Sequence, residues 1–343
     1  MRTPVTVGVV CGSGAGENLS WTFDALAQAQ LRWICNGHPR LGRIARGLGA
    51  RWTRDLADLL CDEELDAVVF ASSEPGTTVE ALAALEADKH VLIEGPLART
   101  SAEADALVAA ATRCNRRLMA YHPDLVHAGV LRLHRLIERG ALGELYYVHV
   151  ERWVESDDAD LDLLWEPGSE AVSLVLDVLA DEPFEVIGRG HSYLGRGRAD
   201  VVFGELHFAT GITAHLHLSC LEGDAAGRLT VVGSDATAVL ELIESRCALS
   251  VYVKASTSGR RGFGVEAGSR IELPVAQDDA RLTGCTQFLT SIRSPTENAP
   301  GREASTPLGV VEALARSSTA GGAAEPVAAV SPPVQNVIAL KGR

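Results

Sequence analysis

The sequence predicts an α/β fold in which a doubly wound parallel sheet is followed by a second, α+β domain built mainly from antiparallel strands. With 343 residues, 46% of them apolar and 22% charged, the chain is long enough for two well-filled cores. Up to about Ala120, short apolar strands alternate with helical patterns, as in parallel α/β sheets. Beyond Ala120, long strands follow one another with few helices between them, which favours antiparallel pairing.

The first domain begins with the apolar run Val5–Val10. Glycines follow it, so we interpret the run as a buried strand leading into a turn and not as a cleavable signal. Each later strand is followed by a helical pattern, and this order predicts the parallel sheet. The other strands are expected at Leu31–Cys35, Ala67–Ala71, His90–Ile93 and Arg117–Ala120, and the helices at Asn18–Gln30, Leu41–Leu48, Thr78–Ala87 and Ala102–Arg113.

The second domain is entered through a helix at Val130–Arg139. Its strands alternate apolar and polar residues, so we expect an open sheet face that self-association buries. The domains are predicted at residues 1–122 and 123–330, with a Pro-rich tail at 331–343. The strands are expected at Glu144–Trp153, Glu185–Tyr193, Val201–Phe208, Thr213–Cys220, Leu229–Val232, Ala238–Leu242, Leu249–Lys254 and an edge within 320–329, and the helices at Glu170–Leu179, Arg281–Arg293 and Leu308–Ser317.

Composition argues against several classes of partner. The net charge of −14 disfavours nucleic acid and anionic membranes. No apolar run approaches membrane-spanning length. The seven cysteines form no Cys-x-x-Cys pair, which is typical of a reducing compartment and not of a disulfide frame or a zinc site. We therefore expect a cytoplasmic protein without a metal.

Five separate motifs, in the right order, resemble the Gfo/Idh/MocA oxidoreductase family. They are Gly8–Val10, Val68–Ala71, Lys89–Ala98, Gly140–Leu145 and Leu229–Ser234. The resemblance implies a Rossmann-type domain and then a domain whose large open sheet packs against another subunit. It also implies hydride transfer between NAD(P) and a sugar, an inositol or a related carbonyl compound.

The dinucleotide fingerprint of that family, Gly-x-Gly-x-x-Gly, is altered here. Its three positions fall on Cys11, Ser13 and Gly16, so only the third glycine is present. Gly12 and Gly14 are offset by one residue and could support a shifted phosphate loop. The alternative is a glycine-rich turn that only joins strand to helix. Cofactor candidates in this loop are therefore Gly12, Ser13, Gly14 and Gly16.

The position of the family's ribose-binding acid carries Asn36. Without that negative charge, His38 or Arg40 could pair with a 2′-phosphate, which favours NADP over NAD. Alternatively, Asn36 forms a turn that caps a helix while Arg40 faces water. Ser72 and Glu94 complete the cofactor candidates. We expect dinucleotide binding to be weak or absent.

The catalytic groups that the resemblance implies are missing. Gly95 replaces the lysine of Glu-Lys-Pro, and Glu170 replaces the histidine of Asp-x-x-x-His, with Glu166 at the aspartate. Oxidising an alcohol needs a group that accepts the hydroxyl proton. The remaining candidates are His122, Tyr121, Glu170 and Glu94. A backbone or capping role is the alternative for His122, and the favoured interpretation for His127.

Two further clusters have a simple interpretation. His207, His215 and His217 lie on neighbouring strands, where they could bind a metal, but we favour a sheet face at an interface. The acidic run at residues 155–162 could attract a cation, but a solvated loop is favoured.

Two hypotheses of function remain. The first is a divergent homologue with a degraded hydride-transfer centre, acting as an accessory, regulatory or sugar-binding subunit in sugar-type or secondary metabolism. The second is an NAD(P)-dependent oxidoreductase, with NADP favoured, that reduces a sugar-like carbonyl or imine through a rearranged acid–base set. An enzyme that performs a non-redox reaction in the same cleft is a variant of this second hypothesis. Fold alone does not choose between them.

Overall fold

The chain forms two compact units in the computed structural model. The first comprises Met1–Pro123, Asp279–Gly309 and Val330–Leu340, and the second Asp124–Asp278, Val310–Ala329 and Lys341–Arg343. Each unit is considered below by itself. The structure describes residues 3–12, 16–35, 38–72, 74, 76–155, 161–195, 197–222, 225–243, 246–254, 268–276, 279–293, 302–327 and 337–338.

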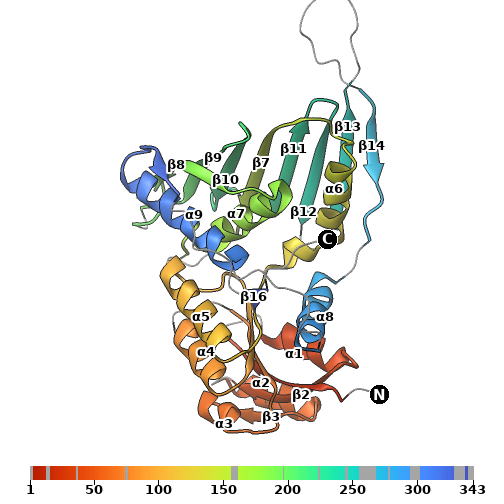
Figure 1. The fold of residues 1–343 in the computed structure, drawn as a ribbon, viewed down its shortest axis with the longest axis vertical. Coiled ribbons are helices and arrows are strands. Elements are labelled where there is room, and N and C mark those ends of the chain that lie inside the picture. The colour runs from red at the N-terminus through yellow and green to blue at the C-terminus, as the bar shows by residue number, and fades with distance from the viewer. Residues whose placement is uncertain are drawn as a thin grey trace, which may run out of the picture. The chain divides into compact units, whose positions relative to one another are not determined.

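The first unit is built on a parallel sheet with the strand order β16-β6-β5-β4-β1-β2-β3 (Figure 1). Without β16, this is the order of a doubly wound dinucleotide-binding sheet, with its switch point between β1 and β4. The strands are β1 (Val5–Val10), β2 (Ala29–Cys35), β3 (Arg51–Thr53), β4 (Ala67–Phe70), β5 (His90–Glu94), β6 (Leu118–Tyr121) and β16 (Val337–Ile338).

Helices cover both faces of this sheet. α4 packs against α5 on one face, and α1 packs against α8 on the other (Figure 1). Side chains cap several helices: Asp55 accepts from the backbone of Ala57 at 2.9 Å, and Thr100 from that of Glu103 at 3.1 Å. The helices are α1 (Gly16–Ala25), α2 (Pro39–Gly47), α3 (Leu56–Leu60), α4 (Thr77–Glu86), α5 (Ser101–Arg113) and α8 (Ala280–Arg293).

Helix α8 comes from the far end of the sequence, yet it belongs to the first unit. Its Gly284 lies against Tyr121, so that a Cβ added there would stand 2.1 Å from the Tyr121 ring. Phe288 and Leu289 of α8 are fully buried. The boundary expected near residue 122 therefore lies close to that of the structure, whereas residues 279–309 and 330–340 differ from the expected division. The order of elements along the sequence did not predict that these later segments belong to the first unit.

The second unit contains a nine-stranded sheet with the order β14-β13-β12-β11-β7-β10-β9-β8-β15. All neighbours are antiparallel except β7 and β10, which run parallel. The strands are β7 (Leu145–Trp153), β8 (Pro183–His191), β9 (Val201–Phe208), β10 (Thr213–Ser219), β11 (Ala226–Gly233), β12 (Ala236–Ile243), β13 (Arg246–Val253), β14 (Arg270–Leu273) and β15 (Glu325–Pro326).

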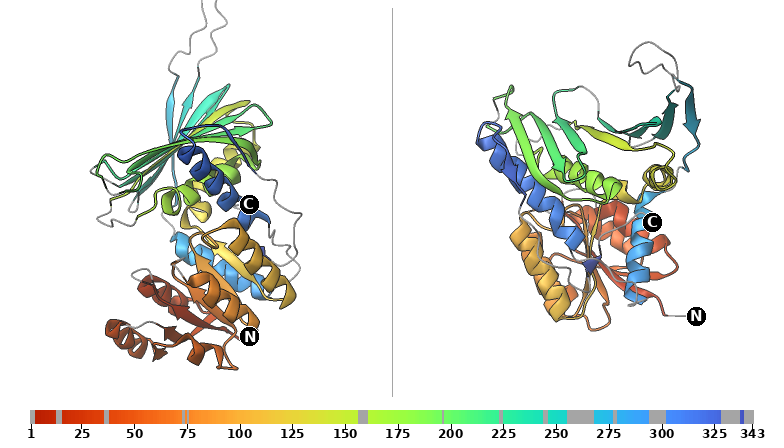
Figure 2. Two further views of the ribbon diagram at one scale, coloured as in Figure 1. Left: turned by 90° about the vertical axis from the view of Figure 1, so that its left-hand side faces the viewer. Right: turned by 45° about the horizontal axis from the view of Figure 1, so that its top comes forward.

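Helices of this unit cover one face of the sheet (Figure 2). α6 (Ala128–Glu138) packs on β12 and β13, and α7 (Glu166–Leu179) on β7 and β10. The second half of α9 (Arg302–Thr319) covers the β8–β9 end, where Gly188 and Gly204 leave room for Leu314. Alternation along the strands turns the other side chains to the opposite face, which no described helix of the unit covers.

The predicted fold class is confirmed, and most element bounds lie within a few residues of the prediction. The missed elements are short or lack an apolar pattern: the three-residue edge strand β3, the one-turn η1 (Pro123–Val126), the five-residue α3, the exposed edge strand β14 and the two-residue β16, which lies in the predicted tail. Helix α1 ends at Ala25, before the expected Gln30, because Ala29 already pairs with Val5 in the sheet. Among the described residues, no helix combines the length and apolarity needed to cross a membrane.

Candidate functional site

The phosphate loop keeps one glycine contact that a dinucleotide-binding fold requires. A Cβ on Gly16 would stand 2.2 Å from Cys11 Sγ, so α1 can approach β1 only because this residue is glycine. Burial raises the pKa of the Cys11 thiol to about 11, which makes it an inert packing group at neutral pH. Ser13 and Gly14 lie outside the described residues.

Gly12 faces side chains that are poorly suited to a pyrophosphate. A Cβ on Gly12 would stand 2.3 Å from Ser72 Oγ and 2.6 Å from Glu74 Oε1. The carboxylate of Glu74 therefore lies against the loop where phosphate oxygens would approach. Burial raises the pKa of Glu80, at the start of α4, and the negative charge of Glu74 raises it further. A phosphate placed here would meet negative potential.

The two candidates for a 2′-phosphate already have partners. Arg40 forms an ion pair with Glu17 in the first turn of α1, with Nε and Oε1 3.0 Å apart. His38 is the N-cap of α2, and its Nδ1 accepts the backbone N–H of Arg40 at 3.2 Å. The N-cap of α2 is thus His38, and Arg40 pairs with a carboxylate and does not only face water. Asn36 lies outside the described residues.

At the carboxyl end of β5, the acid of the altered Glu-Gly-Pro motif forms an ion pair with an arginine. Glu94 Oε1 lies 3.3 Å from Nε of Arg281, which α8 supplies within the same unit. Gly95 follows with a φ of 100°, a conformation that favours glycine. The backbone of this motif is thus adapted to glycine and does not simply lack a lysine side chain.

Tyr121 and His122 end β6, and both are buried. The Tyr121 hydroxyl makes no hydrogen bond to the part of the chain that the structure describes. Burial raises the pKa of Tyr121, and the nearby Cys285 and Glu94 raise it further, so its proton is held tightly. Tyr121 is therefore a packing residue beneath α8, and our expectation that it could exchange a proton finds no support in its surroundings. His122 is 6% exposed.

The second unit contains a partly buried charged cluster of Glu170, Arg152 and Asp124. Arg152 is at the end of β7, on the face that α7 covers, and it forms an ion pair with Asp124. Burial lowers the pKa of Arg152, whereas it raises the pKa of Glu170, an effect that the charge of Arg152 opposes. We conclude that Glu170, the residue at the family's histidine position, is an acid with an increased tendency to stay protonated.

Sequence reasoning missed Arg152, Arg281 and Glu74. A signal for Arg152 exists, because Val148, Val150 and Arg152 share one strand face, and a charge there is exceptional in a core. No such signal marks Arg281, whose role depends on the return of α8. His127 caps α6 by accepting the backbone N–H of Gly129 at 3.1 Å, as the favoured interpretation held.

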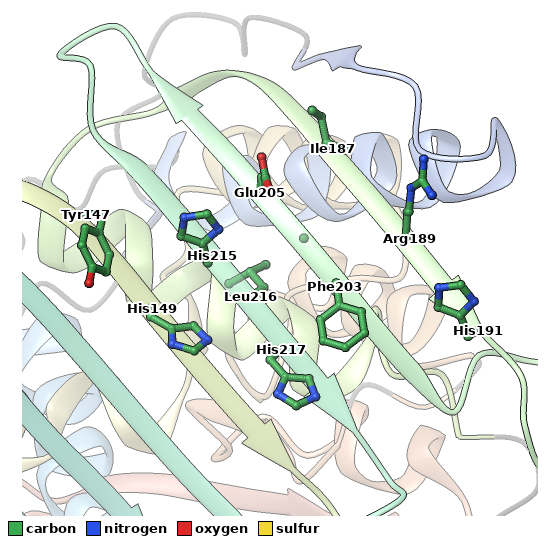
Figure 3. Close-up of a pocket in the computed structure, with 11 residues that line it drawn as sticks. Tyr147, His149, Ile187, Arg189, His191, Phe203, Glu205, His215, Leu216 and His217 are labelled. Carbon is green, nitrogen blue, oxygen red and sulfur yellow. The ribbon is translucent and has the colours of Figure 1, made fainter.

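The open sheet face of the second unit has a hollow of about 540 Å³ (Figure 3). Its lining combines histidines, one arginine, one glutamate and two aromatic rings. No group of three or more possible metal ligands is placed to hold an ion among the described residues. The side chains that project from the strands around the hollow are Tyr147, His149, Ile187, Arg189, His191, Phe203, Glu205, His215, Leu216 and His217.

Comparison with known proteins agrees with the fold. Residues 5–122 match the profile of the Gfo/Idh/MocA group, described as an oxidoreductase family with an NAD-binding Rossmann fold. The structure superposes on UDP-N-acetylglucosamine 3-dehydrogenase GnnA from Acidithiobacillus ferrooxidans with a TM-score of 0.78, at 21% identity, covering 93% of this chain and 99% of that one. The family match thus covers residues 5–122, about a third of the chain, and the superposition shows that the fold is shared over nearly its whole length.

Two curated relatives are similar over part of their length. The 1,5-anhydro-D-fructose reductase of Ensifer adhaerens is 30% identical over 185 residues, which are 50% of this chain and 55% of that protein. The dTDP-3,4-didehydro-2,6-dideoxy-alpha-D-glucose 3-reductase of Saccharopolyspora spinosa is 32% identical over 148 residues, 42% of this chain and 44% of that protein. The chain thus spans about half the length of the curated relatives it matches.

The residues present fit the dinucleotide of this family only in part. The sheet order, the switch point and the Gly16 contact suit it. Glu74 at Gly12, and the Glu17–Arg40 pair at the start of α1, do not suit a pyrophosphate or a 2′-phosphate. The fold is therefore that of a dinucleotide-binding domain, and a carboxylate, that of Glu74, lies beside Gly12 of its loop.

Proposed function

We propose that this chain is a sugar-binding homologue of the family's oxidoreductases that no longer performs their hydride transfer, and that it acts as an accessory or regulatory subunit. The single observation that carries this proposal is the conformation of Gly95. Its φ of 100° disfavours a lysine at the position where the family resemblance implies the catalytic base. A lysine would therefore be strained on the backbone of this chain.

Three further features support the same function. Glu94 is paired with Arg281, Arg40 is paired with Glu17, and Glu74 lies against Gly12. Each of these contacts involves a residue that lies where a cofactor or substrate group would otherwise be expected. A sugar-like ligand is the class expected, because the relatives named above act on sugars by their names.

A second candidate function rests on Glu170. Its pKa is raised by burial, and a carboxylic acid kept protonated near neutral pH can donate a proton to a carbonyl oxygen. In this alternative the chain reduces a sugar-like carbonyl or imine, with hydride from a bound NADPH or NADH. Glu170 would then replace the histidine in function as well as in position.

Calorimetric titration with NADH and NADPH tests the first proposal. We expect no binding, or dissociation constants well above the micromolar range, with any residual preference for NADPH. Glu74→Gln should then raise the affinity by on the order of tenfold, because one negative charge leaves the phosphate loop. Glu63→Gln, an exposed acid away from the loop, is the matched control and should change nothing. Low-micromolar binding of NADH by the unaltered protein contradicts the proposal.

A double substitution separates the two candidates. If only the proton-transfer pair were lacking, Gly95→Lys with Glu170→His would produce oxidation of a sugar or an inositol with NADP, because general acid–base groups contribute about 10²–10⁴-fold. We expect no turnover, since small misplacements at the reacting atoms already cost about 10²-fold. For the reductase candidate, Glu170→Gln should abolish a carbonyl reduction that the unaltered protein performs.

A further inference from the structure

The guanidinium of Arg281 lies at the carboxyl edge of the parallel sheet in the first unit. Arg281 comes three residues before Gly284 in α8, so the two residues share one face of the helix. Gly284 lets this face approach Tyr121, the last residue of β6. Tyr121 is paired in register with Glu94, the last residue of β5. The close approach of α8 thus brings Arg281 to Glu94 at the ends of two neighbouring strands.

Glu94 engages the Nε side of this guanidinium. Nε of Arg281 lies 3.3 Å from Glu94 Oε1, and the two Nη atoms make no hydrogen bond to the part of the chain that the structure describes. The Arg281 side chain is 29% exposed, so solvent reaches it. Arginine presents its N–H donors as a planar fork, and those of the Nη atoms are therefore available to a ligand.

A buried hydroxyl lies close to this ion pair. The hydroxyl of Tyr121 makes no hydrogen bond to any residue that the structure describes. Burial raises the pKa of Tyr121 most, and Cys285 adds to this effect. Glu94 and Asp279 raise that pKa further and Arg281 lowers it, so all three charges act on the hydroxyl. Because a buried polar atom without a partner costs free energy, this hydroxyl indicates that a polar molecule belongs beside the pair.

The carboxyl edge of the sheet is also the place where this class of fold binds ligands. In open α/β sheets, ligands bind outside the carboxyl ends of the strands, near the point where the strand order reverses. β5 is next to β4, which forms that point together with β1. Gly95 follows β5 directly and has no side chain that could place a cation there. The cation beside Glu94 comes instead from Arg281.

The charges at this edge favour an uncharged ligand. Glu94 balances the charge of Arg281, and Asp279, which accepts the backbone N–H of Arg281 at 2.9 Å, adds a second carboxylate. A carboxylate or phosphate on the ligand would therefore meet two negative groups and one positive group. An ammonium group cannot accept the Nη donors. A hydroxyl group suits both partners, because its oxygen accepts from Nη and its O–H donates to a carboxylate.

We propose that Arg281 and Glu94 together bind adjacent hydroxyl groups of an uncharged sugar or polyol, with Arg281 supplying the cation that position 95 lacks. This inference rests on the proposed function, and it names the ligand class and the side chains that recognise it. One hydroxyl accepts from the Nη fork, and its neighbour donates to Glu94. Since a guanidinium does not act as a base in proteins, the pair holds an alcohol without removing its proton.

Saturation-transfer NMR with four defined probes tests the proposal. Two probes, D-glucose and myo-inositol, are uncharged, while D-glucuronate and D-glucosamine each differ from glucose in one charged group. We expect the uncharged probes to bind, and both charged probes to bind on the order of tenfold more weakly than glucose. The proposal is overturned if neither uncharged probe binds, or if a charged probe binds more tightly than glucose.

Substitution of Arg281 shows whether this side chain is responsible. Arg281→Gln removes the cation and should weaken binding of the uncharged probes by on the order of tenfold or more. Arg281→Lys keeps the charge without the fork, so its affinity should lie between the two. Arg113→Gln, which removes an exposed arginine from its ion pair with Glu86, is the matched control and should bind as the unaltered protein does. If Arg281→Gln binds glucose undiminished, the role of Arg281 is refuted while sugar binding remains; low-micromolar binding of NADH instead contradicts the proposed function itself.

A second variant decides the question even if Arg281→Gln does not fold. Glu94→Gln leaves the guanidinium of Arg281 without its carboxylate, so the affinity for glucuronate relative to glucose should rise on the order of tenfold. An ion pair that only stabilised the position of α8 would leave this ratio unchanged. Circular dichroism of each variant confirms that it is folded, and an unchanged ratio in folded Glu94→Gln overturns the proposal.

Discussion

At the scale of single residues, Gly95 has a backbone conformation that favours glycine. Because its φ is 100°, any L residue there is strained. We expect both Gly95→Ala and Gly95→Lys to lower the free energy of unfolding by about 1–2 kcal/mol. Thermal or urea unfolding measures this change.

Gly47 provides the matched control for Gly95. It ends helix α2, has no positive φ, and a Cβ there would meet nothing within 4 Å. Gly47→Ala should therefore raise the free energy of unfolding by about 0.4–1 kcal/mol. If Gly95→Lys were as stable as the unaltered protein, the φ of Gly95 would no longer argue against a lysine at this position.

Glu170 leads to a second prediction at this scale. Since burial raises the pKa of Glu170 in the folded chain, its contribution to stability is complete below the unfolded pKa and is lost as the pH rises through the folded one. Glu170→Gln keeps the shape and removes the titration. We expect the unaltered protein to lose free energy of unfolding relative to this variant as the pH rises above about 4.3, the pKa of a free glutamate.

Urea unfolding at several pH values measures the difference in free energy of unfolding between the unaltered protein and Glu170→Gln. The exposed Glu63→Gln is the control, and its free energy of unfolding should depend on pH as that of the unaltered protein does. The contrary result is equally clear. If Glu170→Gln is less stable by about 3–5 kcal/mol at pH 8, then Glu170 is ionised and the variant has lost its attraction to the charge of Arg152.

At the scale of elements, helix α8 depends on a close approach between Gly284 and Tyr121. A Cβ at Gly284 would stand 2.1 Å from a ring that is fully buried and has no room to move. We expect Gly284→Ala to lower the free energy of unfolding by about 1–3 kcal/mol, despite the better helix propensity of alanine.

Gly309 of α9 is the control for Gly284, because a Cβ there meets nothing within 4 Å. Gly309→Ala should raise the free energy of unfolding by up to about 1 kcal/mol. Chemical unfolding of the two variants side by side separates helix propensity from packing. If Gly284→Ala were as stable as Gly309→Ala, α8 would not pack on Tyr121 as the structure shows.

The elements also show what sequence reasoning can reach. Apolar periodicity located the long strands and helices because each buries one face, and the periods of 2.0 and 3.6 residues record that burial. It missed β3 and β14, which are edge strands with little buried surface.

The contacts of the candidate site were harder to predict from the sequence. His127 as a cap follows from local sequence, whereas Glu94–Arg281 joins residues 187 positions apart and leaves no local pattern.

At the scale of the whole molecule, the first unit is incomplete without residues from the end of the chain. Phe288, Leu289 and Cys285 of α8 are fully buried in it, and they cover Tyr121. A chain truncated after residue 123 should therefore expose this apolar surface, bind the dye ANS and unfold without a cooperative transition. The same segment joined through a short linker to residues 279–309 should show a cooperative transition. A cooperative, dye-free truncated chain would contradict the division into units.

The return of α8 also sets an order of assembly during synthesis. When residue 123 leaves the ribosome, its sheet still lacks the helix that closes over β6, and that helix is encoded roughly 150 residues later. At translation rates of about 5–20 residues per second, the wait is on the order of ten to thirty seconds. Throughout that interval the nascent chain carries an open apolar surface, and residues 124–278 can pair eight of the nine strands of the second sheet before the first unit is complete.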